Sequence, residues 1–408
     1  MDVLMTAMEK IKNNPNRDKV GKYIFYTAFI IYLVTHFLMG TMYVYIFYDI
    51  GLSIPYRIMM VAVALAVIKI LFFNRISNWQ ELTIEILVGL LLAVTAINSQ
   101  TMDLLYYYIM ILAAKDLDFK QILKVFIYIE VFMLLFSAFS VYMGWILEVV
   151  NMRTGNAGIR LSLGSVYPTD LAARIFYISL AYVTLKKFRL KLPEYISLLA
   201  ICAFIYFVTD TKVDTLLILL LIVISVFYNT VTKLLYRIGA NTITLVAGAV
   251  VGIEIVLTYL YTANSKIFSI MDRVLSGRLK YGHMAFKDYN VTMFGQFIKE
   301  YANGGIHKGK FNYFFIDVSY LRVLMFGGVV AFVFLVIMLI YSVNKFMNDK
   351  TICLLVALLF AALSSLIDQH LMELSYNIIF IAMLTNNDYF KDKLVGGNNV
   401  EKYNFNNW

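Results

Sequence analysis

Apolar residues fall in dense runs along the chain, and short polar intervals separate these runs. A helix needs about 20 mainly apolar residues to cross the hydrocarbon core of a bilayer. Most runs approach that length, although the run at 104–115 is short and the run at 371–386 is the weakest. Twelve runs are predicted to form membrane helices: 23–47, 55–73, 82–98, 104–115, 122–147, 171–186, 194–209, 213–229, 241–263, 318–341, 351–367 and 371–386. The pattern therefore predicts an all-α polytopic membrane protein with about twelve transmembrane helices.

The composition narrows the class of protein further. Of the 408 residues, 61% are hydrophobic and 15% are charged, which is too apolar for a soluble globular protein. The net charge of +9 comes from lysines and arginines that lie between the apolar runs and form no basic block. We therefore expect contact with anionic lipid headgroups and no nucleic-acid partner. Cys202 and Cys353 lie inside apolar runs, where a free thiol behaves as a small apolar side chain.

Lysine and arginine are unevenly distributed between alternate connections. The basic segment 1–22 carries several of them, whereas the short connections 49–54, 98–103 and 368–373 carry none. Because these residues favour the cytoplasmic side of a membrane, both termini are predicted to be cytoplasmic. The predicted organisation is a cytoplasmic leader at 1–22, a transmembrane domain at 23–386 and a disordered cytoplasmic tail at 387–408.

Three predicted outer segments break this charge rule. They are the loop at 149–170, the turn at 209–214 and the long loop at 264–317, which precedes the tenth predicted span. Long loops cross the membrane largely regardless of their charge, so most of their lysines are interpreted as solvated. Arginines beside glycines are explained less well in this way, because a guanidinium binds phosphate through two parallel hydrogen bonds. We interpret them as candidates for binding an anionic, polyhydroxylated substrate.

Arg160 lies shortly before a predicted membrane helix that Thr169 or Asp170 would cap. The amides and the dipole at the start of that helix favour a nearby anion. Pro168 disfavours helical geometry at the residue before it and so marks the boundary. An ordinary capped loop with one surface arginine explains the same residues equally well.

In the long loop, Arg278 follows Gly277 and is suited to bidentate contact with a phosphate. The simpler interpretation is an exposed Asp272–Arg273 pair near a helix start, worth under about 1 kcal/mol. Ser276-Gly277-Arg278 is a weak motif alone. It gains weight because it is predicted to lie on the same membrane face as Arg160.

Asp317 ends the long loop and directly precedes a predicted span. Partial burial there would raise its pKa toward that of a general base, while the alternative is a helix N-cap. His283 and His307 have no spacing typical of a metal site and read as surface histidines. His370, with Asp368 and Glu373, either joins a site or solvates a helix hairpin, and the second interpretation is favoured.

Four segments carry a family resemblance. They are Arg160 to Ala172, Thr209 to Lys212, Ser276 to Arg278, and Asp317 to Leu321 with Gly327-Gly328. Their order resembles the Wzy-type polymerases of capsule, exopolysaccharide and O-antigen, which belong with the O-antigen ligases and, more distantly, the SEDS peptidoglycan polymerases. Lys212 stands where relatives often have arginine, and ligases often have histidine at the position of Asp317.

The resemblance implies a metal-independent glycosyltransferase of the GT-C type in a bacterial cytoplasmic membrane, with no cofactor. It would join oligosaccharide repeat units linked to undecaprenyl pyrophosphate on the outer face, and a chain-length regulator is a further implied partner. Arg160 and Arg278 would stabilise the diphosphate, and Asp317 would accept the proton of the attacking hydroxyl. The other predicted substrate-binding residues are Arg273, Lys212, Tyr320, Arg322, Gly277 and His283.

Three rival functions stay open. A flippase or transporter of lipid-linked glycans would need charges and broken helices near the membrane midplane, for which Glu85 and Glu130 are the best candidates. A ligase that moves finished glycan to another acceptor fits the same residues. A non-catalytic scaffold leaves the outer arginine–glycine segments without a purpose.

Overall fold

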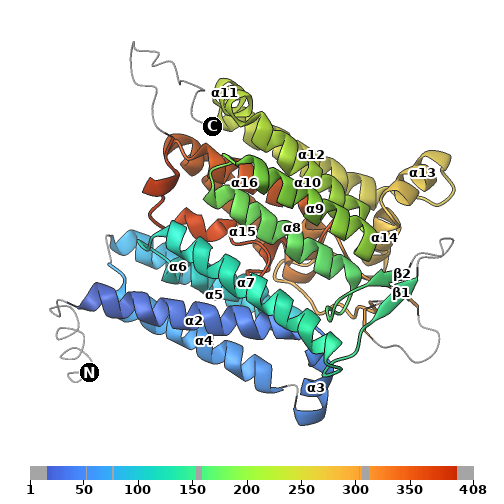
Figure 1. Ribbon diagram of the computed structural model, residues 1–408, viewed down its shortest axis with the longest axis horizontal. Coiled ribbons are helices and arrows are strands. Elements are labelled where there is room, and N and C mark those ends of the chain that lie inside the picture. The colour runs from blue at the N-terminus through green and yellow to red at the C-terminus, as the bar shows by residue number, and fades with distance from the viewer. Residues whose placement is uncertain are drawn as a thin grey trace.

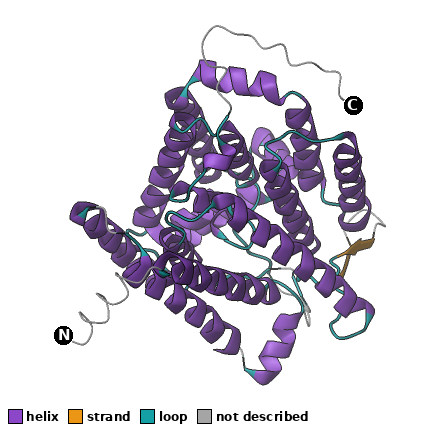
Figure 2. Cartoon of the chain, turned by 60° about the vertical axis from the view of Figure 1, so that its left-hand side comes forward, coloured by secondary structure: helices purple, strands orange, loops and turns teal. Residues whose placement is uncertain are grey.

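A computed structural model gives the structure of the chain and describes residues 16–51, 53–75, 78–152, 159–302, 304–305 and 312–392 (Figure 1). Helices make up most of it, and the two strands form one small pair at the edge of the molecule (Figure 2). The helices are α2 (Arg17–Met39), α3 (Tyr43–Ile50), α4 (Ser53–Phe73), α5 (Trp79–Ser99), α6 (Asp103–Ala113), α7 (Phe119–Tyr142), α8 (Pro168–Leu185), α9 (Leu192–Thr209), α10 (Lys212–Val226), α11 (Tyr228–Ile238), α12 (Ala240–Tyr259), α13 (Lys266–Val274), α14 (Arg278–Asp288), α15 (Ser319–Asn348) and α16 (Ile352–Ser364). The strands are β1 (Val150–Met152) and β2 (Ile159–Leu161), and the 3₁₀ turns are η1 (His370–Met372), η2 (Ile379–Met383) and η3 (Asp388–Phe390).

Among the described residues, seven helices are long and apolar enough to cross a membrane: α2, α4, α5, α7, α9, α12 and α15. Together α10 and α11 make an eighth candidate, bent by 88° between the two helices. These helices expose much apolar surface, as α12 shows with only 6% of its most apolar window buried. In water such surface would be costly, so the chain is a multi-pass, all-α membrane protein.

The remaining apolar runs form shorter or more buried elements. The runs at 104–115 and 351–367 become α6, with 11 residues, and α16, with 13. The run at 171–186 becomes α8, whose side chains are mostly buried by the other helices. The prediction of a helix at 371–386 is wrong, because this segment runs irregularly through the bundle and contains only the turns η1 and η2.

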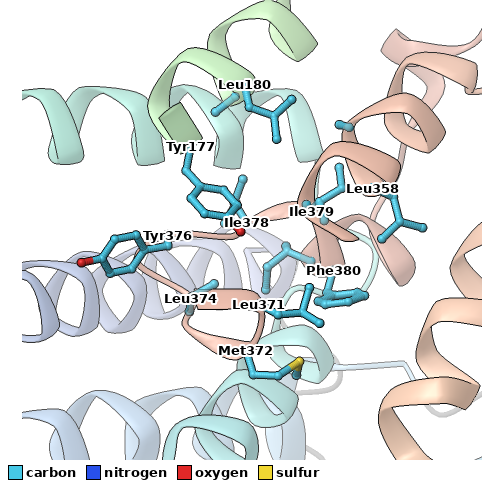
Figure 3. Packing of buried hydrophobic residues seen from close by; sticks show 14 of the residues in the cluster. Tyr177, Leu180, Leu358, Leu371, Met372, Leu374, Tyr376, Ile378, Ile379 and Phe380 are labelled. Carbon is cyan, nitrogen blue, oxygen red and sulfur yellow. The ribbon is translucent and has the colours of Figure 1, made fainter. Parts of the chain in front are cut away.

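Side chains replace the missing helical hydrogen bonds in this last segment. Asn377 Nδ2 donates to the carbonyl of Leu371 at 2.9 Å, and Asn387 Nδ2 donates to the carbonyl of Ala382 at 2.7 Å. The hydroxyl of Tyr107 on α6 donates to the carbonyl of Asn377. Irregular backbone in a membrane protein is tolerated where protein covers it. Five apolar side chains of this segment accordingly pack between Tyr177 and Leu180 of α8 and Leu358 of α16 (Figure 3). They are Leu371, Leu374, Ile378, Ile379 and Phe380.

Helix α15 is broken at Gly328, where φ is +77°. The loop at 292–296 fills the break: Val329 N donates to the carbonyl of Thr292 at 2.9 Å, and Gln296 N donates to the carbonyl of Phe326 at 2.9 Å. A Cβ atom on Gly328 would lie 2.4 Å from the backbone nitrogen of Gly295. Only glycine tolerates both the positive φ and this close approach of two backbones.

The predicted outer segments meet at one end of the bundle. Val166 N donates to the carbonyl of Gly40, and Gly305 N donates to the carbonyl of Val166. Asn98 Nδ2 donates to the carbonyl of Phe294 at 3.0 Å. Figure 1 shows the β1–β2 hairpin, α13 and α14 together at this end, on the right. The convergence of connections far apart in sequence is what makes a site possible here.

Both ends of the described chain contact the start of α7, at the opposite end of the bundle. Lys22 Nζ donates to Gln121 Oε1 at 2.6 Å, and Phe119 N donates to the carbonyl of Asn386 at 3.1 Å. Helix α2 already begins at Arg17, inside the predicted leader, and residues 1–15 lie outside the described residues. Phe390, in the predicted disordered tail, is fully buried against Phe119, and residues 393–408 lie outside the described residues.

Candidate functional site

Arg278 is held at a sharp turn between α13 and α14. Ser276 and Gly277 have φ values of +56° and +89°, and Gly277 N donates to the carbonyl of Asp272. Arg278 Nε donates to the carbonyl of Ile367 at 2.6 Å, and its Nη1 donates to the carbonyl of Leu275 at 3.0 Å. Its Nη2 has no hydrogen-bond partner among the described residues. The glycine at 277 is thus needed for the turn, and the guanidinium is anchored along one edge.

Asp317 precedes α15 but does not cap it, so the capping interpretation is wrong. The N-cap residue is Val318, and the amide of Ser319 is bound by the carbonyls of Ser365 and Asp368. The carboxylate is half-buried and makes no hydrogen bond or ion pair with any residue that the structure describes. Burial raises the pKa of Asp317 to about 6, although the nearby Arg278 guanidinium opposes the rise. This pKa range suits a general base at neutral pH.

Arg322, one turn into α15, is engaged by a carboxylate. Its Nη1 donates to Glu300 Oε1 at 2.8 Å and to Oε2 at 2.9 Å. The guanidinium also lies over the rings of Phe326, at 4.6 Å, and Phe315, at 5.1 Å. Glu300 therefore neutralises the positive charge of Arg322 inside the protein, and this pair holds Arg322 in a fixed position from which it lowers the pKa of Asp317.

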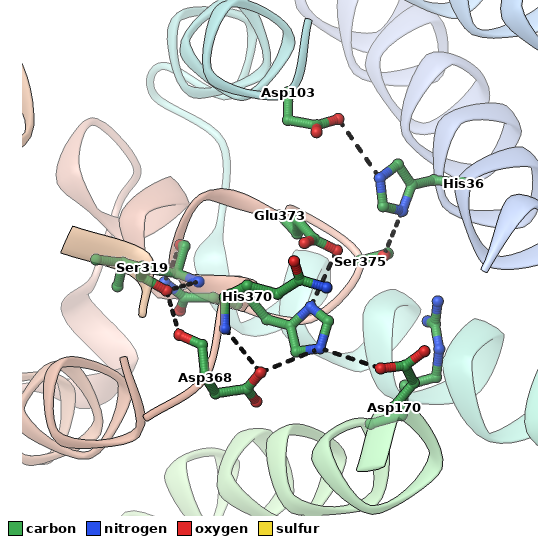
Figure 4. Close-up of polar contacts among 12 residues, drawn as sticks. His36, Asp103, Asp170, Ser319, Asp368, His370, Glu373 and Ser375 are labelled. Carbon is green, nitrogen blue, oxygen red and sulfur yellow. Dashed lines mark hydrogen bonds and ion pairs between the residues drawn. The ribbon is translucent and has the colours of Figure 1, made fainter. Parts of the chain in front are cut away.

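The buried His370 stands at the centre of a cluster of half-buried carboxylates (Figure 4). Its Nε2 is 3.3 Å from Asp368 and 3.9 Å from Asp170, and its Nδ1 is 3.1 Å from Glu373. Burial lowers the pKa of His370, but the carboxylates of Asp368 and Glu373 outweigh it and raise the pKa to about 9. With 3% of its surface exposed, the imidazolium cannot solvate a hairpin, so the favoured interpretation of this trio is wrong.

A second charged pair supports this cluster from within the bundle. Arg174 Nη1 of α8 lies 3.2 Å from Glu130 Oε2 of α7, and each side chain is only 1% exposed. The guanidinium lies 4.1 Å from the ring of Phe37 and 4.2 Å from the ring of Tyr376. Tyr376 in turn stacks on His370 with a centroid distance of 3.6 Å. The two buried cations thus both contact the Tyr376 ring.

Arg160 lies on β2, in antiparallel register with Asn151, and is 7% exposed. Its Nε donates to the carbonyl of Thr209 at 2.7 Å, so the structure brings two of the predicted outer segments together. The guanidinium lies 5.7 Å from the ring of Tyr167. The residues 153–158 at the tip of this hairpin lie outside the described residues.

Tyr313 joins the surroundings of Arg160 to those of Arg278. Burial raises the pKa of the Tyr313 hydroxyl, the charges of Asp317 and Tyr167 raise it further, and Arg278 lowers it. These four groups are therefore near neighbours, with Tyr167 also adjacent to Arg160. The strand β2, which carries Arg160, and the helix α14, which begins at Arg278, lie at the same end of the molecule (Figure 1).

The other predicted binding residues are placed less favourably. Arg273 and Lys212 are exposed, and neither makes a hydrogen bond or ion pair with another described side chain. The Tyr320 hydroxyl donates to the carbonyl of Ala362 at 3.0 Å within the core, and His283 Nδ1 lies 3.0 Å from the carbonyl of Tyr259. His307 lies outside the described residues. The geometry thus favours one set of candidates over the other predicted binding residues. The favoured set is Asp317, Arg278, Arg160 and Arg322.

Sequence reasoning missed several members of the site. Thr169 and Asp170 do not cap α8, because Tyr167 is its N-cap and makes no side-chain cap, and the Asp170 carboxylate lies beside His370 instead. Asp214 and Arg174 were passed over as parts of apolar runs. A charge inside such a run was the available signal, since ionisable residues in membrane helices mark functional or paired positions.

Across the described residues, no group of three or more His, Cys, Asp and Glu side chains is arranged to hold a metal ion. No family model, curated protein or solved structure matches this chain. Its function must therefore be argued from the geometry of the site.

Proposed function

We propose that the protein is a membrane glycosyltransferase that polymerises oligosaccharide repeat units linked to undecaprenyl pyrophosphate. The observation that carries the proposal is a half-buried, unpaired carboxylate, Asp317, near an anchored arginine, Arg278, whose charge lowers the pKa of Asp317 without an ion pair. The carboxylate has no partner among the described residues, and burial holds its pKa near neutrality. Such a pair can accept a proton and stabilise a leaving anion in one site.

The proposed reaction needs no external energy source. A sugar hydroxyl of the incoming unit attacks the anomeric carbon of the growing glycan, and the bond from that carbon to the pyrophosphate oxygen breaks. The hydroxyl proton passes to the Asp317 carboxylate, and undecaprenyl pyrophosphate leaves with the bonding electron pair. Arg278 stabilises the charge that develops on the leaving group, and Arg160, from the same end of the bundle, adds to this stabilisation. Binding both units at one end of the bundle removes the need for a chance encounter.

The sidedness in the proposal follows from charge and connectivity. Both described chain ends contact the start of α7, at the end opposite the site. That end carries the lysine-rich connections, and basic connections favour the cytoplasm. We therefore assign the site to the outer face of a bacterial cytoplasmic membrane and both termini to the cytoplasm. A GT-C-like arrangement of spans, with α6, α8 and α16 packed among them, belongs to the same proposal.

A transporter of lipid-linked glycans is the second candidate function. The break in α15 and the buried Glu130–Arg174 pair favour it, because discontinuous helices and intramembrane charges are typical of transporter sites. Here, however, loop residues already satisfy the amides freed by the break, so those amides are not available to a substrate. The ion pair likewise neutralises its own charges.

Purified protein in detergent, mixed with lipid-linked repeat units, separates the two candidates. Detergent removes the two compartments, so a transporter has nothing to transport between, whereas a polymerase still lengthens glycans. We expect a ladder of lipid-linked products, resolved by gel electrophoresis, that Asp317→Asn abolishes. Wild-type protein that leaves single units unchanged would refute the polymerase. One transfer to a different acceptor, without a ladder, would identify a ligase.

A further inference from the structure

A cavity of about 70 Å³ opens beside the proposed reaction site. It lies between the end of α5, the start of α6, the first turns of α15 and the segment at 369–373. By volume it holds about five water molecules, because one water needs roughly 10–15 Å³ measured in this way. Its polar lining residues are Thr95, Ser99, Thr101, Asp103, Ser319, Arg322, Gln369 and Glu373.

Several polar groups on its walls have unused hydrogen-bonding capacity. Within the described residues, the side-chain amide of Gln369 has no partner, and only Oε2 of Glu373 is engaged, by His370. Arg322 uses Nη1 for Glu300, which leaves Nη2 without a partner in the described part of the chain. Asp103 faces His36 at 3.5 Å but keeps a side chain that is 47% exposed. Residues with unused hydrogen-bond donors and residues with unused acceptors therefore line the same cavity.

The charge of the cavity distinguishes its ligand from a diphosphate. Asp103 and Glu373 carry negative charge, and the one cationic lining residue, Arg322, is already paired with Glu300. A phosphate group would be repelled by this lining, whereas the surroundings of Arg278 and Arg160 attract it. A hydroxyl group both donates and accepts, and carboxylates, amides and guanidinium groups match it from either side.

The cavity is also adjacent in the chain to the proposed base. Ser319 and Arg322 line it from the first turn of α15, which begins two residues after Asp317. Phe326 and Gly327 complete that wall, immediately before the break at Gly328. A ligand in the cavity is therefore held by the same helix end that positions Asp317.

We propose that this cavity binds a sugar ring of the acceptor oligosaccharide through its hydroxyl groups, apart from the diphosphate held near Arg278. Calling the ligand an acceptor rests on the proposed function. The binding of a polyhydroxylated ligand can nevertheless be tested by itself. Gln369 is the residue chosen for the test, because its amide lines the cavity without supporting the fold through a side-chain bond to the described residues.

The experiment measures binding by calorimetry on full-length protein that carries Asp317→Asn, so that no turnover occurs. The probes are the repeat-unit oligosaccharide, released by mild acid from the lipid-linked units of the source cells, and undecaprenyl pyrophosphate. We expect Gln369→Ala to weaken oligosaccharide binding roughly tenfold and to leave lipid diphosphate binding unchanged. Gln80→Ala is the matched control, because Gln80 is exposed at the other end of α5. It should change neither affinity.

Unchanged oligosaccharide binding in Gln369→Ala would overturn the inference. A cavity that binds sodium ions in a way that depends on Gln369, but does not bind the oligosaccharide, would also overturn it. If Gln369→Ala fails to fold, Thr101→Val provides the same test from another wall. Loss of lipid diphosphate binding together with the sugar would also overturn it, because the two subsites would then be one. If Gln369→Ala weakens oligosaccharide binding but the wild-type protein shows no chain growth, the polymerase function is refuted and the sugar-binding site is supported.

Discussion

Asp317 differs from the neighbouring carboxylates in having no partner among the residues described. Glu300 is paired with Arg322, and Glu373 and Asp368 are paired with His370. Burial would raise the pKa of Glu373, but His370 lowers it to about 2, so this carboxylate is a poor proton acceptor at neutral pH. The absence of such a pairing, together with burial, is what makes Asp317 the most suitable base in the site.

The pH dependence of chain growth tests this role. The base acts when deprotonated, so the rate should rise as pH increases through about 6, the pKa of Asp317, and level off above it. Asp317→Asn should lower the rate by about 10²–10⁴-fold at every pH. Rates of lipid-linked chain growth between pH 4.5 and 8 provide the measurement, and a rate that is flat across pH 6 would contradict the assignment.

The same pKa predicts an effect on stability. The folded-state pKa of Asp317 is raised above its usual value of 3.8, so the folded state binds the proton more tightly than the unfolded state. The contribution of Asp317 to stability is therefore greatest below pH 4 and is lost as pH rises through about 6. At pH 7, Asp317→Asn should raise the melting temperature in detergent while it abolishes activity. A lower melting temperature would indicate a structural role instead.

Arg278→Lys tests the stabilisation of the leaving group. A lysine cannot donate to the Ile367 and Leu275 carbonyls and still present a fixed donor to a phosphate oxygen. Chain growth should fall by about 10²–10³-fold, as it does when one such donor is lost from other sites. Arg237→Lys is the control, because Arg237 is exposed in the last turn of α11. This substitution should leave the rate unchanged. Equal rates in both variants would remove Arg278 from the mechanism.

At the scale of elements, α15 is the helix on which the site depends. Its first turn carries Ser319 and Arg322, and its break at Gly328 receives the loop at 292–296. The loop and the helix satisfy each other's backbone groups, which is required where water is excluded. The break therefore ties the long connection before α15 to the helix that positions Asp317.

Gly328→Ala should disrupt this junction. The new Cβ atom would lie 2.4 Å from Gly295 N and 2.6 Å from the carbonyl oxygen of Thr292, at a φ of +77°. Backbone strain of this kind costs about 1–3 kcal/mol, so the melting temperature should fall by several degrees. Gly248→Ala on α12 should leave it unchanged, because no atom lies within 4 Å of a Cβ built there. Equal melting temperatures would show that the loop is not held in the break.

At the scale of the whole molecule, the connections predicted to be outer lie at one end and the chain ends lie at the other. The hydrogen bond from Arg160 to Thr209 and the contact of His370 with Asp170 join segments that are far apart in sequence. Spans that alternate in direction bring every second connection to the same end, and packing then decides which of them touch.

Cysteine labelling in whole cells tests the orientation of this arrangement. With Cys202 and Cys353 replaced by alanine, a membrane-impermeant maleimide should label Lys212→Cys in intact cells. It should label Lys233→Cys only after the membrane is permeabilised, because Lys233 lies on α11 at the other end of α10. The reverse pattern would place the site in the cytoplasm and would contradict polymerisation on the outer face.

The sequence alone determined the properties that depend on local composition. Apolar runs predicted the multi-pass helical protein. Asp317 and Arg278 could be nominated because a carboxylate or an arginine beside glycine stands out in a polar segment. Arg273 and Lys212 show the limit of that reasoning, since these basic residues of the same polar segments are exposed and unpaired among the residues described.

Tertiary structure alone decided where burial and long-range pairing occur. The run at 371–386 has the composition of a span, but Tyr107, Asn377 and Asn387 satisfy its backbone from elsewhere and allow an irregular path. His370 and Arg174 become a buried cluster only because α8 and the last segment pack together. Hydrophobicity is a property of each residue and its neighbours in the chain, whereas a partner for a buried charge is supplied by whichever distant segment folds against it.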